Sequence, residues 1–366
     1  MNTKMSSRKA WNWHRQHNWL CGFNYLPRTA VNWNEMWQKE SFDEETIRQE
    51  LSWAADVGYN SLRTNLPFIV WEQSPRELKD RVARFLSICE GFGISVMLTL
   101  LDDCEFSGEP PRLGRQPSPE AGVHNSRAVG SPGRAMVMTP EEWHKIELYV
   151  KDVIGEFVSD SRVAIWDLYN EPSNRMIFNA GVEQEFDVEL EEHSLRLMEL
   201  CFMWAREVGP TQPLTVAAWH TPSVFEPDRP LFGHPTDQRA LELSDIISFH
   251  AYMPLEQMQQ AIEFLKSYER PLICSEWMGR HVGSLLTEQL PLFCREAIGC
   301  YQWGLVEGKT QTYLPWPMLS RINAASSGDW FHDVLHSDGS AYDKEETDLV
   351  RNLTAANRNE QRGLDR

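Results

Sequence analysis

Short, nearly continuous apolar runs alternate along the chain with longer stretches in which apolar and polar residues recur at helical spacing. Runs of this length and composition are typical of strands that are buried on both faces, as in a parallel sheet. Eight runs are therefore predicted to be strands: 19–27, 59–68, 94–103, 163–172, 213–219, 245–252, 271–278 and 300–308.

The segments between these runs carry the signals of helix starts and stops. Residues 43–58 begin with acidic residues and end at a glycine, and residues 74–93 begin with Ser74 as a cap and Pro75 in the first turn. Strands that alternate with helices in this way predict an α/β protein, a single (β/α)8 TIM barrel. Further helices are expected over 139–157, 183–208, 256–270, 286–299 and 340–354, the last closing the ring.

Two connections are longer than a minimal barrel needs. Residues 104–138, rich in Pro, Gly and Ser, follow the third strand, and residues 309–334 follow the eighth. Loops of this length are usually either functional or disordered, and both would emerge at the face where barrel active sites are built. The expected organisation is an N-terminal extension, a catalytic barrel and a frayed C-terminal tail, over residues 1–18, 19–357 and 358–366.

Composition and charge narrow the classes of function. A chain of 366 residues, 42% of them hydrophobic, can bury a sizeable core. Its formal net charge of −18 argues against nucleic acid or an anionic membrane as a partner, because like charges repel. No run approaches the roughly 20 apolar residues that span a bilayer, and the N-terminus lacks the apolar segment of a signal peptide. The expected location is the cytoplasm.

The cysteines and tryptophans add two expectations. Most of the seven cysteines lie inside apolar stretches, which predicts buried, reduced thiols rather than a disulfide framework. There is no CxxC pair, so a cysteine zinc site is not expected, and the sequence predicts no metal or other cofactor. Fifteen tryptophans are many for this length, and flat aromatic faces suit sugar rings.

Two of the predicted strands end in a glutamate. Glu171 ends the fourth, in VAIWDLYNEP, and Glu276 ends the seventh, in PLICSEWM. Pro172 should bias Glu171 towards extended backbone and out of any following helix. Strands four and seven face each other across a barrel mouth, so the carboxyl groups can approach the spacing of about 5–5.5 Å that a retaining glycosidase needs. The pair therefore predicts cleavage of a glycosidic bond.

Other polar residues at predicted strand ends would surround this pair. A nucleophilic carboxylate must stay ionised, which Arg63 and Tyr252 would favour, whereas a catalytic acid must hold its proton near neutrality. His220 or His250 could tune that second group. The remaining candidates at strand ends are Asn24, Asp102, Asp103, Asn170 and Trp303.

The combination of these motifs resembles clan A glycoside hydrolases, particularly family 5. It consists of NEP on strand four, SEW on strand seven, Arg63 on strand two, HAY on strand six and Trp303 on strand eight. The resemblance covers roughly residues 19–357. It implies a retaining, two-step mechanism in which Glu171 is the acid/base and Glu276 is the nucleophile.

The resemblance also implies roles for neighbouring residues. Asn170 would hydrogen-bond the sugar 2-hydroxyl, and Arg63 and Tyr252 would hold and ionise Glu276. His250 would lie near the acid/base. Trp303 would floor the subsite of the sugar that is attacked, and its peptide bond to Gly304 would be cis, as it often is in the family.

The chain departs from the family pattern after strand three. Family 5 commonly has a histidine there, whereas this chain has LLDDC, which places Asp102 or Asp103 in that region as candidate substrate contacts. The 104–138 loop is not a general feature of family 5, and its His124 and Asn125 are expected at the surface. Lys309 and Gln311 are candidate rim contacts.

The expected function is that of a retaining β-glycoside hydrolase acting on short or terminal β-linked oligosaccharides. The long loop would wall off one end of a cleft, and the absence of a leader fits imported oligosaccharides. An endo-acting β-glycanase (glucanase, mannanase or xylanase) is the alternative. A carbohydrate-binding barrel without catalysis comes next. A metal-dependent barrel hydrolase would need clustered ligands such as HxH on strand one, which here ends in FNYLP.

Overall fold

The computed structural model describes residues 3–179, 188–321 and 328–364. Eight parallel strands form one sheet in the order β5-β4-β3-β2-β1-β8-β7-β6, which curls into a nearly closed barrel. The predicted (β/α)8 barrel, with long loops after β3 and β8, is confirmed. The strands are β1 (Cys21–Asn24), β2 (Ser61–Asn65), β3 (Ser95–Asp102), β4 (Val163–Asn170), β5 (Leu214–Thr215), β6 (Ile247–His250), β7 (Leu272–Trp277) and β8 (Gly299–Gln302).

The barrel closes weakly between β5 and β6. A single bridge joins them, in which the Ala218 amide donates to Ser248 and the amide of His250 donates to Ala218. The predicted strand 213–219 is shorter because two of its later amides bond to side chains instead, that of Val216 to Ser244 Oγ and that of Trp219 to Asp237 Oδ1. The predicted strand 300–308 is also shorter and ends at Gln302.

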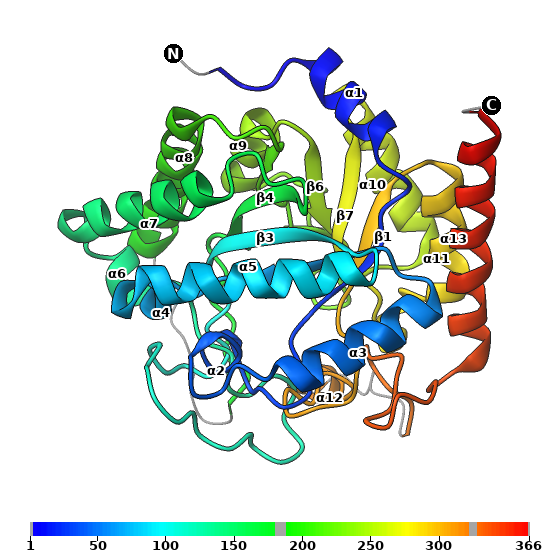
Figure 1. Ribbon diagram of the computed structural model, residues 1–366, viewed down its shortest axis with the longest axis horizontal. Helices are drawn as coiled ribbons and strands as arrows, with labels where there is room; N and C mark the ends of the chain where they lie inside the picture. Colours follow the sequence, from blue (N-terminus) through cyan, green and yellow to red (C-terminus); the bar gives the residue numbers. More distant parts are fainter. Residues whose placement is uncertain (1–2, 180–187, 322–327, 365–366) are drawn as a thin grey trace.

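Helices surround the sheet (Figure 1). Helix α9 follows β5 and was not predicted, since its nine residues are flanked by loop-like sequence. Residues 183–187 of the predicted helix 183–208 lie outside the described residues. The main helices are α1 (Ser7–Gln16), α3 (Glu44–Val57), α5 (Pro75–Gly91), α7 (Trp143–Glu156), α8 (Val188–Val208), α9 (Pro235–Leu243), α10 (Leu255–Lys266), α11 (Leu286–Arg295) and α13 (Lys344–Leu364). Shorter ones are α2 (Trp33–Trp37), α4 (Phe68–Gln73), α6 (Arg134–Val137), α12 (Pro317–Arg321) and the 3-10 turns Pro140–Glu142 and Arg280–Val282.

Helix ends follow the sequence signals closely in one case and less so in two others. Helix α3 starts with the Asp43 side chain accepting from the Thr46 amide and ends at Gly58, whose φ is +112°. Ser74 occupies the N-cap position of α5, but its hydroxyl makes no capping bond, and Pro75 alone marks the start. Helix α13 continues to Leu364, so the segment from residue 358, expected to be frayed, is helical as far as that residue.

The two ends of the barrel are built differently. Helix α1 covers one end, where Ala10 and Trp13 join an apolar cluster with residues such as Ile165 and Ile273. Figure 1 shows α1 at this end and α2 and α12 at the opposite end, beyond the carboxyl ends of the strands. The closed apolar end leaves the opposite mouth as the place where polar strand-end residues gather.

Two long loops cover that mouth and are bonded to each other. The β3 loop (residues 104–138) is anchored near its far end by two backbone hydrogen bonds that Asp102 and Ser131 exchange. The backbone N–H of Asn125 donates to the Thr310 carbonyl over 2.7 Å, and this hydrogen bond joins the β3 loop to the β8 loop (residues 309–334). Residues 322–327 of the β8 loop lie outside the described residues.

Two expectations about the whole chain can be compared with the structure. All seven cysteines are free and six are buried, so the predicted burial of most thiols is confirmed. Within the described ranges, no helix combines the length and the apolar character required to cross a bilayer.

Candidate active site

Arg63, on β2, is the centre of a buried charge network at the mouth of the barrel. Its Nε and Nη2 donate to Asp167 Oδ2 over 2.9 and 2.6 Å, and its Nη1 donates to Glu276 Oε1 over 2.8 Å. Burial alone would lower the pKa of the guanidinium, but the two carboxylates raise it above its ordinary value. Arg63 therefore stays charged and compensates two buried carboxylates, Asp167 and Glu276.

Two asparagines complete the surroundings of Arg63. Asn24 Oδ1 accepts from Nη1 over 2.8 Å, and Asn170 Oδ1 accepts from Nη2 over 2.5 Å. The Asn24 amide donates to the carbonyl of Ser275 and to those of Tyr301 and Gln302, which ties β1 to β7 and β8. Asn24 thus lies beneath the site and orients the arginine rather than facing the main cavity.

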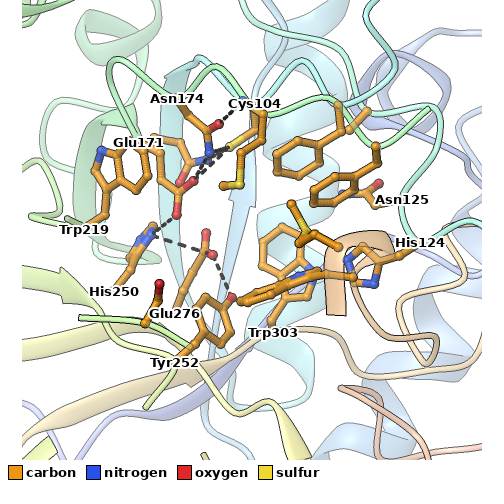
Figure 2. Close-up of a pocket in the computed structure, with 18 of the residues that line it drawn as sticks. Cys104, His124, Asn125, Glu171, Asn174, Trp219, His250, Tyr252, Glu276 and Trp303 are labelled. Carbon is orange, nitrogen blue, oxygen red and sulfur yellow. Dashed lines mark hydrogen bonds and ion pairs between the residues drawn. The ribbon is translucent and has the colours of Figure 1, made fainter. Parts of the chain in front are cut away.

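The two glutamates meet above this network. Figure 2 shows Glu171, Glu276 and His250 side by side. One carboxylate oxygen from each glutamate and one ring nitrogen of His250 lie within 4.8 Å of one another. The Tyr252 hydroxyl donates to Glu276 Oε2 over 2.9 Å, on the side away from Arg63. Glu276 therefore receives one donor on each oxygen, and the Glu171 carboxyl group lies close beside it.

The backbone at Glu171 corrects one expectation. Its φ is +42°, in the left-handed region, whereas Pro172 was expected to hold it extended. Few residues without a glycine's freedom adopt this conformation, and such outliers cluster at functional sites. The turn is closed by the backbone N–H of Asn174, which donates to the backbone carbonyl of Glu171 over 3.0 Å. Strain that is held by surrounding contacts aims the Glu171 side chain at the cavity.

Three side chains fix the Glu171 carboxyl group. His250 Nδ1 lies 2.8 Å from Oε1, and the Asn174 amide donates to Oε2 over 2.6 Å. The Cys104 thiol, at the start of the β3 loop, also donates to Oε2 over 3.1 Å. Burial raises the pKa of this thiol well above its ordinary value, so Cys104 keeps the proton that it donates.

These contacts decide how the pair titrates in the free site. Burial raises the pKa of Glu276 and outweighs His250, Arg63 and Tyr252, which favour its charged form. Burial acts in the same direction on Glu171, but hydrogen bonds from His250, Asn174 and Cys104 outweigh it and lower the pKa of that carboxyl. This order is the reverse of the one that an acid at Glu171 and a nucleophile at Glu276 require, and a negative charge on Glu171 further raises the pKa of Glu276.

Asp102 lies at the edge of the cavity and orients Asn170. Its Oδ1 accepts from the Asn170 amide over 2.9 Å and from the Cys104 backbone amide, and its Oδ2 accepts from Asn65. Burial raises the pKa of Asp102 to about 7 against these hydrogen bonds. The arrangement holds Asn170 between Asp102 and Arg63, where it faces the cavity.

Asp103 and His220 do not face the cavity. Asp103 accepts from the Tyr169 hydroxyl, the Ser173 amide, the Ser194 hydroxyl and Arg175, so its carboxylate binds the β4 turn to α8. His220 pairs with Asp237 over 2.9 Å and stacks on His234 at 3.9 Å. Both residues act on loop structure. In each case the adjacent residue, Asp102 or Trp219, reaches the cavity instead.

A cavity of about 490 Å³ opens above the carboxyl pair, within the usual range for a small-molecule site. Of the sequence candidates, Asp102, Asn170, Glu171, His250, Tyr252, Glu276 and Trp303 line it. Aromatic and apolar residues from the loops form much of the rest: Trp33, Phe106, Ala128, Met176, Phe178, Trp219, Val224, Phe225, Val282, Trp316 and Met318.

One end of the cavity is closed by residues that were expected at the surface. His124 and Asn125 are buried and line the cavity, so that prediction is wrong. The reason is a tertiary contact. His124 Nδ1 is hydrogen-bonded to the Leu314 carbonyl over 2.7 Å, and this bond holds the β3 loop against the β8 loop. Burial lowers the pKa of His124 to about 4. Beside it, Phe106 and Phe178 stack with ring centroids 4.1 Å apart.

Lys309 and Gln311, the candidate rim contacts, support this closed end from outside. Gln311 donates to the carbonyls of Glu120 and Val123 in the β3 loop. Lys309 Nζ lies 3.6 Å from Glu35 Oε1, so the two side chains form an ion pair. Neither lines the cavity, and both hold loops together.

Trp303, directly after β8, lines the cavity on the side of Glu276 and beside the closed end (Figure 2). Its peptide bond to Gly304 is not cis, contrary to what the family resemblance implied; the cis bond in the described chain joins Ser131 to Pro132. Gly304 has a φ of +76°, and a side chain there would collide with Asp333. A glycine therefore makes the turn that presents Trp303.

Sequence reasoning missed several residues that contact the pair or line its cavity. Asn174 lies three residues after Glu171, at the end of NEPSN, and a second amide so close to a candidate acid was the available signal. Cys104 ends the LLDDC segment in which only the aspartates were considered. Phe178, Trp316 and His332 come from loops, where no periodic pattern marks the buried side chains.

The carboxyl pair and His250 are also the one group of described residues whose spacing could hold a metal ion. The donors around them favour another use. Arg63 brings a positive charge to Glu276 Oε1, Tyr252 directs a hydrogen at Glu276 Oε2, and Asn174 and Cys104 direct hydrogens at Glu171 Oε2. Hydrogen-bond donors that face a carboxylate occupy the lone pairs that a metal would need.

No protein-family model matches this chain, and no curated protein matches it. Solved structures do. An exo-β-1,4-mannosidase from Opitutaceae bacterium strain TAV5 matches 92% of this chain with a TM-score of 0.58 and 15% identity. This chain spans 60% of the length of that mannosidase.

Two further structures match at similar distance. The GH5_18 protein from Streptomyces cattleya, in complex with GlcNAc, matches 92% of this chain and 80% of its own length, with a TM-score of 0.57 and 13% identity. A GH5 xyloglucan-specific endo-β-1,4-glucanase from a metagenomic library matches 95% of this chain and 99% of its own, with a TM-score of 0.56 and 14% identity. The chain has the fold of family 5 glycoside hydrolases.

Proposed function

We propose that this protein is a retaining β-glycoside hydrolase that removes terminal sugars from short β-linked substrates. The observation that carries the proposal is the buried pair of Glu171 and Glu276, with different partners on each. Arg63 and Tyr252 hold Glu276, and His250 and Asn174 hold Glu171. The solved neighbours support the class, since they include an exo-β-1,4-mannosidase and a β-1,4-glucanase.

The proposed reaction has two steps. Ionised Glu276 attacks the anomeric carbon while protonated Glu171 donates its proton to the departing oxygen, so that a covalent glycosyl ester forms and the alcohol leaves. Glu171, now ionised, then takes a proton from a water that attacks the same carbon, and Glu276 is released. The pair carries one proton at the start and one at the end, and the anomeric configuration is retained.

The protonation order of the free site must change when substrate binds. The first step needs the proton on Glu171, whereas its hydrogen bonds favour the charged form in the empty site. A glycosidic oxygen placed against the Glu171 carboxyl accepts a hydrogen bond only from the protonated form, and displaced water no longer stabilises the charge. Because a negative charge on Glu171 raises the pKa of Glu276, a proton gained by Glu171 favours the ionised form of Glu276.

The closed end of the cavity favours action on terminal sugars. His124, Asn125, Phe106 and Phe178 wall the cavity beyond Trp303. A chain that continued past the attacked sugar in this direction would meet these side chains. A blocked non-reducing end is the arrangement expected of an exo-acting enzyme, and an endo-acting enzyme would need this side open.

The nucleophile can be identified by trapping. A 2-deoxy-2-fluoro β-glycoside with a good leaving group, carrying a sugar that the enzyme turns over, should form a stable ester with Glu276. Mass spectrometry of the digested protein would locate it. A label on another residue, or a product of inverted configuration by NMR, would contradict the proposal.

The acid/base can be identified by rescue. Glu171→Ala should lose most activity on substrates with poor leaving groups and regain part of it with azide, which replaces water in the second step. Glu105→Ala is a suitable control, since Glu105 is also buried and acidic but bonds to the Arg134 amide away from the pair. An E171A protein that keeps full activity would remove Glu171 from this role.

A further inference from the structure

Exposed apolar side chains gather at one rim of the cavity. Among the described residues, eight large apolar side chains are exposed, and three of them, Met176, Val224 and Phe225, line this cavity. Their exposed fractions are 38%, 45% and 38%. Contiguous apolar surface beside a binding cavity usually marks a place where a partner or ligand is covered.

Val224 and Phe225 lie at the tip of a hydrogen-bonded turn. Ser223 and Glu226 exchange backbone hydrogen bonds of 3.1 and 3.2 Å, which makes Val224 and Phe225 the central residues of a tight turn. Glycine, proline, asparagine, aspartate and serine dominate such positions because of their backbone preferences or local hydrogen bonds. Two bulky apolar residues at the tip of an exposed turn gain nothing for the turn itself.

The polar groups of this rim are largely used within it. Ser223 Oγ accepts from the amides of Phe225 and Glu226. Glu226 and Arg229 form an ion pair with each other. The turn therefore offers an incoming group apolar surface in the first place, whereas the opposite end near Asn125 and His124 is lined by buried polar side chains.

The position of the rim relative to the two glutamates assigns its role. Trp219, which precedes the turn, donates from Nε1 to the carbonyl of Pro172 over 3.1 Å and so lies against the Glu171 turn. Figure 2 shows Trp219 beside Glu171, on the side away from Asn125 and His124. A catalytic acid must face the departing oxygen, so the group attached to that oxygen extends past Glu171 towards Trp219 and the rim.

We propose that Met176, Val224 and Phe225 form a binding site for an apolar leaving group, so that the preferred substrates are β-glycosides of alkyl or aromatic alcohols. This inference rests on the proposed glycosidase function. It makes the rim a determinant of specificity for the departing group, separate from the sugar that Trp303 faces. A second sugar would need hydrogen-bond donors and acceptors, which these three side chains lack.

The test uses alkyl glycosides that differ in apolar area and hardly at all in leaving-group basicity. Methyl, butyl and octyl β-glycosides of the sugar that the enzyme cleaves fastest as an aryl β-glycoside would be compared below the micellar concentration. We expect kcat/KM to rise from methyl to octyl by at least about tenfold, since each buried methylene adds to binding. The β-linked disaccharide of the same sugar should be a poorer substrate than the octyl glycoside.

Matched variants place the effect on the rim. In the double variant Val224→Ser, Phe225→Ser, the octyl-to-methyl ratio of kcat/KM should fall to within about threefold of unity. Phe264→Ser is the control, because Phe264 is similarly exposed at 41% but lies on α10 and does not line the cavity. There the ratio should remain as in the unaltered protein.

The outcomes separate this inference from the function on which it rests. Hydrolysis with equal kcat/KM for methyl and octyl glycosides would overturn the apolar site and leave the glycosidase standing. An octyl preference that survives in the double variant, or a disaccharide that outperforms the octyl glycoside, would do the same. If no β-glycoside in either series is hydrolysed, both proposals fail.

Discussion

The floor and the walls of the cavity are made in different ways. The floor consists of strand-end residues that form a connected polar network around the fully buried Arg63. The walls come from loops and consist mainly of aromatic and aliphatic side chains, such as the stacked Phe106 and Phe178. In the floor most polar atoms have a defined partner, whereas the walls are held by packing and by a few hydrogen bonds between loops, such as the one between His124 Nδ1 and the Leu314 carbonyl.

This difference implies that the floor carries out the reaction and that the walls select the substrate. Charges in a buried network keep their geometry because moving one leaves the others uncompensated. Apolar walls tolerate substitution and reshape the space without altering the proton positions. A change in the floor should therefore affect the turnover of every substrate alike, whereas a change in the walls should also alter which substrates fit.

The largest effect is expected from Arg63→Leu. Asp167 and Glu276 would lose their buried partner, and the free energy of unfolding should fall by about 3–5 kcal/mol. Urea unfolding measures this. Arg239→Ala, which breaks an exposed pair with Glu199, should cost only about 0–1 kcal/mol. Equal losses in the two variants would show that the floor is no more connected than the surface.

A smaller effect is expected in the wall. Phe178→Ala removes half of the stack with Phe106 and should lower the free energy of unfolding by about 3 kcal/mol. It also opens the closed end, so kcat/KM for longer oligosaccharides should rise relative to that for disaccharides. Chromatography of products from a series of chain lengths tests the second effect. Leu148→Ala, an exposed position on α7, should alter neither quantity.

Asn174→Asp probes the floor through pH. The amide that donates to Glu171 Oε2 is replaced by a carboxylate, which removes a contact that lowers the pKa of Glu171 and adds a negative charge. The pKa of Glu171 should rise, and since Glu171 must be protonated for the first step, the basic limb of the kcat/KM profile should move to higher pH. Displacement of the acid should also lower kcat by up to about 100-fold.

The control for this shift is Asn179→Ala, whose amide bonds to the Ser107 carbonyl in the wall. It should leave the limb in place. A basic limb that stays unchanged in Asn174→Asp, or moves to lower pH, would show that Asn174 does not set the protonation of the acid.

The smallest effect is expected from Cys104→Ala. A thiol is a weak donor, so its loss should change kcat/KM by about two- to fivefold and move the basic limb slightly upward. Cys104→Ser should lie closer to the unaltered protein, because a hydroxyl still donates. A change as large as that in Asn174→Asp would mean that Cys104 holds Glu171 as firmly as the asparagine does.

The elements could be predicted where a local pattern reported burial. Strands β3, β4 and β7 lie within the predicted runs because each is a continuous apolar segment. Strand β5 has two residues because the next amide, that of Val216, bonds to the Ser244 side chain from another segment, which no local pattern shows. Helix α9 escaped prediction for a related reason, since its nine residues are too few for a clear period.

The candidate site divides along the same line. Glu171 and Glu276 stand out because each ends an apolar run, where a charged residue has no packing role. His220 is a candidate from the sequence because a titratable residue follows a predicted strand, yet pairing with Asp237 turns His220 away and leaves the adjacent Trp219 in the cavity. His124 was placed at the surface because its loop is polar, and a bond to the Leu314 carbonyl buries it.

The sequence by itself determined the alternation of strands and helices, and with it the two strand ends at which the glutamates stand. Strand order follows from it, because parallel strands joined by helices bring their carboxyl ends to one mouth. Only the tertiary structure decided which side chains meet there: that Asn174 and Cys104 hold Glu171, that two long loops close one end, and that Val224 and Phe225 line the other. Those contacts join residues far apart in the chain or in irregular loops, where side-chain direction depends on packing rather than on a repeating backbone geometry.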